Sequence, residues 1–192
     1  AVQRQERAAE AERQRQERDA ERRRVEQERA EAEEAERRQV EQEQHRLAKT
    51  FAAEIEHYWV AQQSIGRQQA EELSGNEQII ANVYARYLLL KDCYKAGEGG
   101  THAYINDAQL TSIKRSMRAM DNRVEKENSD VDTDRAWKFA VKKYKQTLGR
   151  KWATFRDSSG FAYNGTLAQT CNLNMEQLKN DSSHAFSPES TS

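Results

Sequence analysis

The sequence predicts an all-α protein, in which a long charged helical extension precedes a small antiparallel helical bundle. Charged residues make up 33% of the 192 residues, and there are only one proline and eight glycines. Residues that favour helices therefore dominate, and residues that end them are scarce. In the second part of the chain, apolar residues recur at steps of three and four, as they do on one face of a helix. This composition argues against a mostly β fold, and no apolar run approaches the roughly 20 residues that span a bilayer.

Residues 1–46 form the predicted extension. They include 12 Arg, 14 Asp and Glu, 8 Gln and 8 Ala, and their only large apolar side chains are three valines. Such a segment has too little apolar surface to form a core, yet most of its residues favour a helix. Opposite charges three or four residues apart, such as Glu21 with Arg24 and Glu34 with Arg38, each add about 0.2–0.5 kcal/mol. We expect a solvated single helix, about 70 Å long at 1.5 Å per residue.

Two alternatives for this extension are a coiled coil and a disordered charged arm. A coiled coil needs apolar residues at the a and d positions over three or four heptads. Val25 and Val40 stand fifteen residues apart, with alanine as the only apolar residue between them. A coiled coil would therefore have to pair through a seam of alanines.

Residues 47–179 form the predicted bundle. An amphipathic stripe that includes Leu47 and Phe51 continues the first helix, and Ser74 with Glu77 has the pattern of a capping box that starts the next one. The further helices are expected over residues 76–96, from 106 or 107 to about 124, over 133–155 and over 166–178. Short connections such as residues 97–100 favour antiparallel neighbours. Residues 180–192 are rich in serine and are predicted to be a disordered tail.

Cys93 and Cys171 are the two cysteines, and their wide separation lacks the close ligand pairs of a zinc site. Two interpretations remain open. They are free thiols in a cytosolic protein, or they form one disulfide that joins the last helix to the end of helix 76–96. The sequence begins at Ala1 without Met, which agrees with export without establishing it.

No arrangement of residues typical of catalysis stands out. Glu54 and His57 form one Glu-x-x-His on a helix, whereas di-iron bundles place two such motifs on different helices. We expect a solvent-facing histidine there. The sequence therefore predicts no enzyme, no metal site, no cofactor and no evident small-molecule substrate.

Residues 135–156 carry a run of Lys and Arg with no acidic residue between them. The candidate basic surface consists of Lys138, Lys142, Lys143, Lys145, Arg150 and Lys151. A cationic amphipathic helix of this kind can bind an anionic membrane or a nucleic acid. The alternative is an ordinary core helix, because the interleaved aromatic residues fall mainly on one face. The acidic residues of segment 121–134 could then offset the basic charge.

Several short motifs give residues 84–178 a resemblance to a group of known proteins. Cys93-Tyr94 stands near a helix end, a glycine turn and Tyr104-Ile105-Asn106-Asp107 follow, and Trp137 and Cys171 come later. This order resembles small exported helical proteins of Gram-negative bacteria. The run over residues 97–100 departs from their more usual Arg-x-Gly-Tyr-like turn. The resemblance implies a periplasmic location and a disulfide, and it implies no reaction.

From these features we expect a non-enzymatic structural or interaction protein, exported to the periplasm or secreted. Its helical bundle would be projected on the charged strut and would bind a protein partner or its own kind. The alternative is a module that uses the basic helix 135–156 to bind a nucleic acid or an anionic membrane. A cytoplasmic location is the alternative to export.

Overall fold

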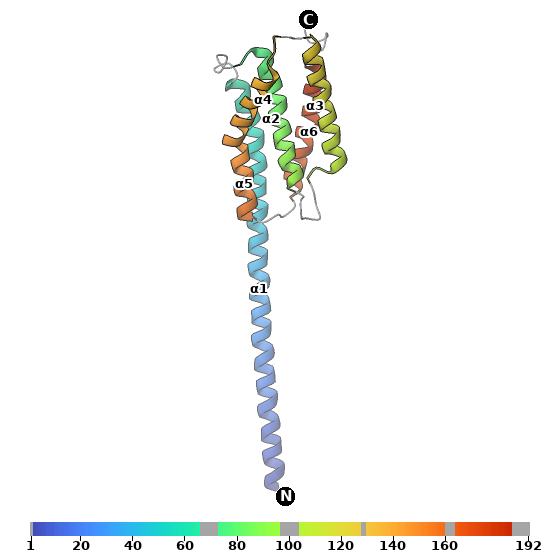
Figure 1. Ribbon diagram of the computed structural model, residues 1–192. Coiled ribbons are helices and arrows are strands. Elements are labelled where there is room, and N and C mark those ends of the chain that lie inside the picture. Colours follow the sequence, from blue (N-terminus) through green and yellow to red (C-terminus); the bar gives the residue numbers. More distant parts are fainter. Residues whose placement is uncertain (1, 66–72, 97–103, 128–129, 160–163, 186–192) are drawn as a thin grey trace. The chain divides into compact units, whose positions relative to one another are not determined.

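The computed structural model describes residues 2–65, 73–96, 104–127, 130–159 and 164–185 (Figure 1). Over these ranges the chain forms six α-helices and no strand, which confirms the prediction of an all-α fold. The helices are α1 (Val2–Ile65), α2 (Gly75–Lys95), α3 (Asp107–Glu127), α4 (Thr133–Gln146), α5 (Leu148–Ser159) and α6 (Gly165–His184). The chain divides into two compact units, Ala1–Glu43 and Gln44–Ser192.

The first unit is the charged part of α1, and we call its residues 2–43 the arm. Every side chain of the arm is exposed. Ion pairs follow the predicted helical spacing: Arg24 Nη2 lies 2.8 Å from Glu21 Oε1, and Arg38 pairs with Glu34. Exposed pairs of this kind contribute little individually and are screened by salt.

The second unit begins at Gln44, three residues before the start at 47 that composition indicates. His45 Nδ1 lies 3.0 Å from Asn164 Nδ2, and Ala48 and Phe51 are buried. A polar contact thus holds the helix in the bundle before Leu47, where its apolar stripe begins.

Helix α2 is the central helix of the bundle and packs against α3, α4, α5 and α6. It runs antiparallel to α3, because Tyr84 Oη donates to Asp121 at 2.7 Å and, towards the other end, Tyr94 Oη donates to Asp107 at 2.7 Å. Figure 1 shows α3 and α6 beginning at the end of the bundle where α2 finishes. The antiparallel arrangement predicted for sequential neighbours therefore holds for α2 and α3.

Helices α2 and α4 run parallel, and the buried carboxylate of Glu77 joins their first turns. It accepts a hydrogen bond from the Ser74 N–H at 3.1 Å, which completes the predicted capping box. It also accepts from the Asp132 N–H at 3.2 Å and from Arg135 Nε and Nη2 at 3.0 and 2.8 Å. Burial raises the pKa of Glu77, but hydrogen bonds from Arg135 and Ser74 outweigh it, so that the pKa is lowered overall.

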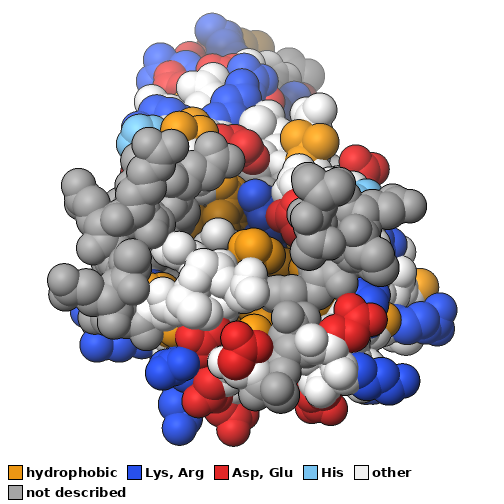
Figure 2. All heavy atoms as spheres, turned by 90° about the horizontal axis from the view of Figure 1, so that it is seen from above, with side chains coloured by type: hydrophobic (Ala, Val, Ile, Leu, Met, Phe, Trp, Pro, Cys, Tyr) orange, Lys and Arg blue, Asp and Glu red, His pale blue; other side chains and the backbone are white. Residues whose placement is uncertain are grey.

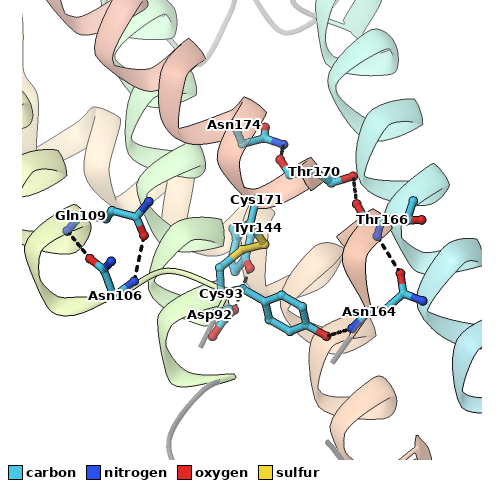
Figure 3. Close-up of a disulfide and its surroundings, with 11 residues drawn as sticks. Asp92, Cys93, Asn106, Gln109, Tyr144, Asn164, Thr166, Thr170, Cys171 and Asn174 are labelled. Carbon is cyan, nitrogen blue, oxygen red and sulfur yellow. Dashed lines mark hydrogen bonds between the residues drawn. A yellow bond between two sulfur atoms is a disulfide. The ribbon is translucent and has the colours of Figure 1, made fainter. Parts of the chain in front are cut away.

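Local capping starts three other helices. Asn106 and Gln109 exchange side chain–backbone hydrogen bonds at the start of α3 (Figure 3). Asp132 caps α4, and Asn164 Oδ1 accepts from two backbone N–H groups at the start of α6. A side-chain oxygen at these positions satisfies N–H groups that lack a partner within the helix.

The single helix expected over residues 133–155 is wrong, because Thr147 divides it into α4 and α5. Thr147 has φ −122° and ψ −95°, outside the helical region. Both halves contact α2. Helix α5 also packs on α1, where Trp152 lies edge-on to Phe51 with ring centroids 5.0 Å apart. The break at Thr147 therefore gives α5 a direction of its own against α1.

Helix α6 is longer than the expected 166–178, and residues 180–184, predicted as tail, belong to it. Its buried positions continue past Leu178 to Ser182, whose carbonyl accepts a hydrogen bond from Arg123. Two of its buried residues, Asn174 and Ser182, are polar, so the sequence shows no continuous apolar stripe along this helix. Residues 186–192 of the predicted tail and the predicted turn at 97–100 lie outside the described residues.

Of the two interpretations of the cysteines, the structure has the disulfide. Cys93 of α2 and Cys171 of α6 are bonded, with Cα atoms 6.3 Å apart, and both side chains are fully buried (Figure 3). The bond joins helices 78 residues apart in sequence. It therefore fixes the second half of α2 against the first half of α6.

We predict that Glu77→Gln lowers the free energy of unfolding at pH 7 by about 1–3 kcal/mol, because a buried charged hydrogen-bond network loses its acceptor. A lowered carboxyl pKa stabilises the fold above about pH 4.5, the ordinary Glu value, and this contribution is lost as pH falls through the pKa of the folded state. The difference between the two proteins should therefore shrink below pH 4.5. Urea unfolding from pH 3 to 7 measures it, with exposed Glu176→Gln as the matched control. Equal stability of Glu77→Gln and the unchanged chain at pH 7 would contradict this role.

Loss of the disulfide should lower the free energy of unfolding by more than Glu77→Gln does. For a separation of 78 residues, the chain-entropy account gives about 4 kcal/mol. Thermal unfolding with and without reductant should show a lower Tm for the reduced chain. The double variant Cys93→Ala/Cys171→Ala should melt at a low Tm that does not respond to reductant. Two reactive thiols in the denatured, unreduced protein would refute the bond.

Candidate anion-binding cleft

A cleft of about 440 Å³ lies between α2 on one side and α4 and α5 on the other. We call it the cationic cleft, after the four basic side chains that line it: Lys91, Lys95, Lys145 and Arg150. Its other lining residues are Leu88, Asp92, Tyr144, Gly149 and Ala153. The residues from α2 are spaced three or four apart, so they share one helix face. The cleft thus collects charge from three helices.

The break at Thr147 brings Lys145 and Arg150 into the same cleft. On one continuous helix, residues five positions apart point about 140° away from each other, at about 100° per residue. Here Lys145 ends α4 and Arg150 begins α5, and both line the cleft. At Gly149 an added Cβ would lie 3.3 Å from the Tyr144 carbonyl oxygen, so the two helices approach closely at the break.

Asp92 is the acidic residue of the cleft lining, and other groups already occupy its carboxylate. Tyr144 Oη donates to Asp92 Oδ2 at 2.6 Å, and Arg156 Nη2 lies 3.5 Å from Asp92 Oδ1. Burial and the Asp92 charge raise the pKa of Tyr144 well above its usual value, so its hydroxyl stays protonated. Asp92 also neighbours Cys93 on α2, so the disulfide helps to hold this side of the cleft in place (Figure 3).

The lining residues therefore include four basic side chains against one engaged carboxylate, and carbon atoms form most of the surface of the cleft. Lys91 Nζ lies 5.7 Å from the centre of the Tyr87 ring, a cation–π contact. Among the described residues, no carboxylate lies within 4.0 Å of the charged groups of Lys95, Lys145 or Arg150. An electrostatic field of this kind concentrates anions from solution.

The acidic residues of segment 121–134 do not offset this charge. Exposed carboxylates gather where α3 ends and α4 begins, at the end of the bundle seen in Figure 2; they are Glu125, Glu127, Asp130, Asp132 and Asp134. Lys145 stands eleven residues after Asp134, or about 17 Å along the helix axis. This exceeds the screening length of about 8 Å at physiological salt. Asp134 and Lys145 thus lie near opposite ends of α4.

The structure does not gather the six residues of the predicted basic surface into one face. Lys145 and Arg150 line the cationic cleft, whereas Lys138 and Lys142 are exposed on α4 outside its lining. Two others have partners on other side chains. Lys143 Nζ lies 5.5 Å from the centre of the half-buried Phe139 ring, and Lys151 Nζ lies 3.1 Å from Glu54 Oε2.

The basic residues predicted from the sequence do not include Lys91 and Lys95. They belong to α2, whose apolar stripes identify it as a core helix and draw attention away from its polar face. Their spacing of four residues was visible as a pair on one face. That this face lies opposite Lys145 depends on the packing of α4 and α5, which periodicity does not specify.

A second cleft, of about 520 Å³, lies between α2, α3 and α4. Its lining pairs two basic residues, Lys114 and Arg118, with two acidic ones, Asp121 and Asp134. This balance gives no electrostatic preference for either sign of ligand charge. The cationic cleft is therefore the better candidate for a site that selects its ligand by charge.

The Glu54-x-x-His57 motif gains no further metal ligands within the described ranges. Glu54 is engaged by Lys151, and His57 is exposed. Over the part of the chain that the structure describes, no three His, Cys, Asp or Glu side chains gather in a way that could hold a metal ion. None of the described helices is both long and apolar enough to pass through a bilayer.

The chain was compared with known proteins by family, by sequence and by structure. No family model, no curated protein and no solved structure matches it. The resemblance to small exported helical proteins therefore stays an expectation. Function must follow from the geometry and charge of the chain itself.

Proposed function

We propose that this protein is a non-enzymatic interaction protein, in which the arm serves as a charged helical spacer and the disulfide-joined bundle binds a protein partner or a second copy of the chain. The observation that supports this most directly is the contrast in burial: the arm is exposed along its whole length, whereas residues 44–185 carry the core. A helix that buries nothing contributes length and not a core.

The arm suits a spacer because its helix is maintained locally. Ion pairs between neighbouring turns, such as Arg29 Nε with Glu33 Oε1 at 2.9 Å, need no contact from the rest of the chain. Its large apolar side chains, Val2, Val25 and Val40, are all more than half exposed. Val25 and Val40 stand fifteen residues apart, a spacing that does not repeat the a and d positions of a heptad, so they supply no regular seam for a coiled coil. We therefore propose that the arm is a single, unpaired helix.

Export is part of the proposal, and the disulfide supports it. Disulfides persist in oxidising compartments and are rare in the reducing cytosol. Cys93 and Cys171 are fully buried and join two helices of the core, as expected for a structural bond. A cytoplasmic location remains the alternative and would require the two thiols to be free.

The second candidate function is binding of a nucleic acid or an anionic membrane by helix residues 135–156. It requires a continuous basic face. Because Lys143 and Lys151 contact other side chains and the helix breaks at Thr147, the geometry supports this candidate less well than the spacer. Lys145 and Arg150 contribute instead to the cationic cleft.

The spacer proposal predicts a long, narrowly distributed distance within the arm. Spin labels on Gln5→Cys and Gln39→Cys, in the otherwise intact chain, should lie about 51 Å apart if the 34 intervening steps are helical. A flexible chain of that length would give a broad distribution near 30–35 Å. The native cysteines do not react, because they are bonded to each other.

Singly labelled Gln5→Cys is the control for self-pairing. A lone helix predicts no short distance between the arms of two molecules, even where their bundles associate. A short, defined intermolecular distance at Gln5 and, in the corresponding single variant, at Gln39 would show that arms pair side by side as a coiled coil, and a broad intramolecular distribution would show a disordered arm. Either result would overturn the lone spacer.

A further inference from the structure

We propose that the cationic cleft between α2 and α4–α5 binds a small polyanion, a molecule with two or more phosphate groups, held by Lys91, Lys95, Lys145 and Arg150. This inference goes beyond the proposed function and does not rest on it, because the cleft lies wholly within residues 88–153.

The first argument is the placement of like charge. Four basic side chains from three helices line one hollow, and the carboxylate among them is occupied by Tyr144 and Arg156. Like charges gathered in this way repel one another and lower the stability of the fold. A bound anion would remove this repulsion. A ligand for the cleft would therefore explain why the fold keeps four basic side chains together at a loss of stability.

The second argument is independent and comes from the start of α5. The first turn of a helix carries partial positive charge, which acidic residues stabilise and basic residues do not. The first turn of α5 has no acidic residue and contains Arg150 and Lys151. Gly149, which has no side chain to cover the backbone, lines the cleft at this turn. An anion there would meet both the basic side chains and the positive end of the helix.

The dimensions indicate the size of the ligand. A volume of about 440 Å³ falls within the 300–1,000 Å³ common for small-molecule sites. Lys91 and Lys95 are one turn apart on α2, and Lys145 and Arg150 line the opposite wall. A ligand with linked phosphate groups would place negative charge against both walls at once, which a single phosphate group does less well. The half-buried Leu88 and the neighbouring Ala153 offer apolar surface to a connecting framework.

A small ligand suits the site better than a polymer. A nucleic acid or membrane surface would use charge spread along an exposed face. Of the basic residues outside the cleft, Lys151 pairs with Glu54 and Lys143 contacts Phe139. Lys138 and Lys142 are exposed on α4 and precede Lys145 by seven and three residues, so they are the positions that a longer anion would use and that the control variants test.

Inorganic tripolyphosphate is the probe that tests the site. Calorimetric titration of the intact, oxidised chain should give one binding site, and Tm should rise with tripolyphosphate concentration. Lys145→Gln and Arg150→Gln should each raise Kd by about tenfold, as expected for one lost charge-assisted contact. The double variant Lys91→Gln/Lys95→Gln, on the opposite wall, should weaken binding by at least as much. Monophosphate should bind much more weakly than tripolyphosphate.

Lys138→Gln and Lys142→Gln are the matched controls, since each removes the same charge from exposed positions of α4 outside the cleft lining. Both should leave Kd within about twofold. Without ligand, the cleft variants should melt at the same temperature as the unchanged chain or higher, because they relieve repulsion.

Three results would overturn the proposal. The first is no binding of tripolyphosphate at about 1 mM. The second is an equal loss of affinity in the control and cleft variants, which would indicate unspecific attraction by net charge. The third is preference for a single-stranded oligonucleotide or for vesicles with anionic lipid, with affinity that depends on Lys138 and Lys142. That result would favour a polymer or membrane face instead.

Discussion

The position at which hydrophobic burial begins governs the rest of the structure. No leucine, isoleucine or aromatic residue precedes Leu47, and removal of apolar surface from water is the main driving force for folding. The arm therefore stays exposed, while residues from Ala48 onward collapse around α2. The first consequence is that the two units depend on different forces. Local backbone hydrogen bonds and ion pairs maintain the arm, whereas packing, the Glu77 network and the disulfide maintain the bundle.

Within the bundle, three interactions of α2 determine where the other helices lie. Glu77 fixes the start of α4, and Cys93 fixes α6. Asp92, next to Cys93, accepts a hydrogen bond from the Tyr144 hydroxyl and so holds the end of α4 against α2. The turn of α2 that contains Asp92 and Cys93 thus stabilises the bundle and also forms part of one wall of the cationic cleft. Reduction of the disulfide would disturb both together, which links the redox state of the chain to the shape of its candidate site.

The sequence indicates those features that short segments determine. The Ser74–Glu77 capping box starts α2 where it is predicted, and the recurrence of apolar residues at steps of three and four predicts the helices of the bundle. Features that depend on distant segments are different. The Glu77–Arg135 contact spans 58 residues, and the break at Thr147 lies where α5, besides α2, contacts α1. The cleft depends on both the break and the lysines of α2. The sequence therefore shows the basic residues of segment 135–156, but it does not show that two of them face Lys91 and Lys95.

Hydrogen exchange of the backbone amides, followed by mass spectrometry, tests the division of the chain into an arm without a core and a packed bundle most directly. Amides of residues 2–43 should exchange within seconds, with little protection, because each exposed turn opens locally. Amides of the middle of α2 should exchange only when the bundle unfolds globally, and reduction of the disulfide should accelerate them while leaving the arm unchanged. Protection of the arm equal to that of α2 would contradict the account, because it would mean that the arm is buried in contacts of its own.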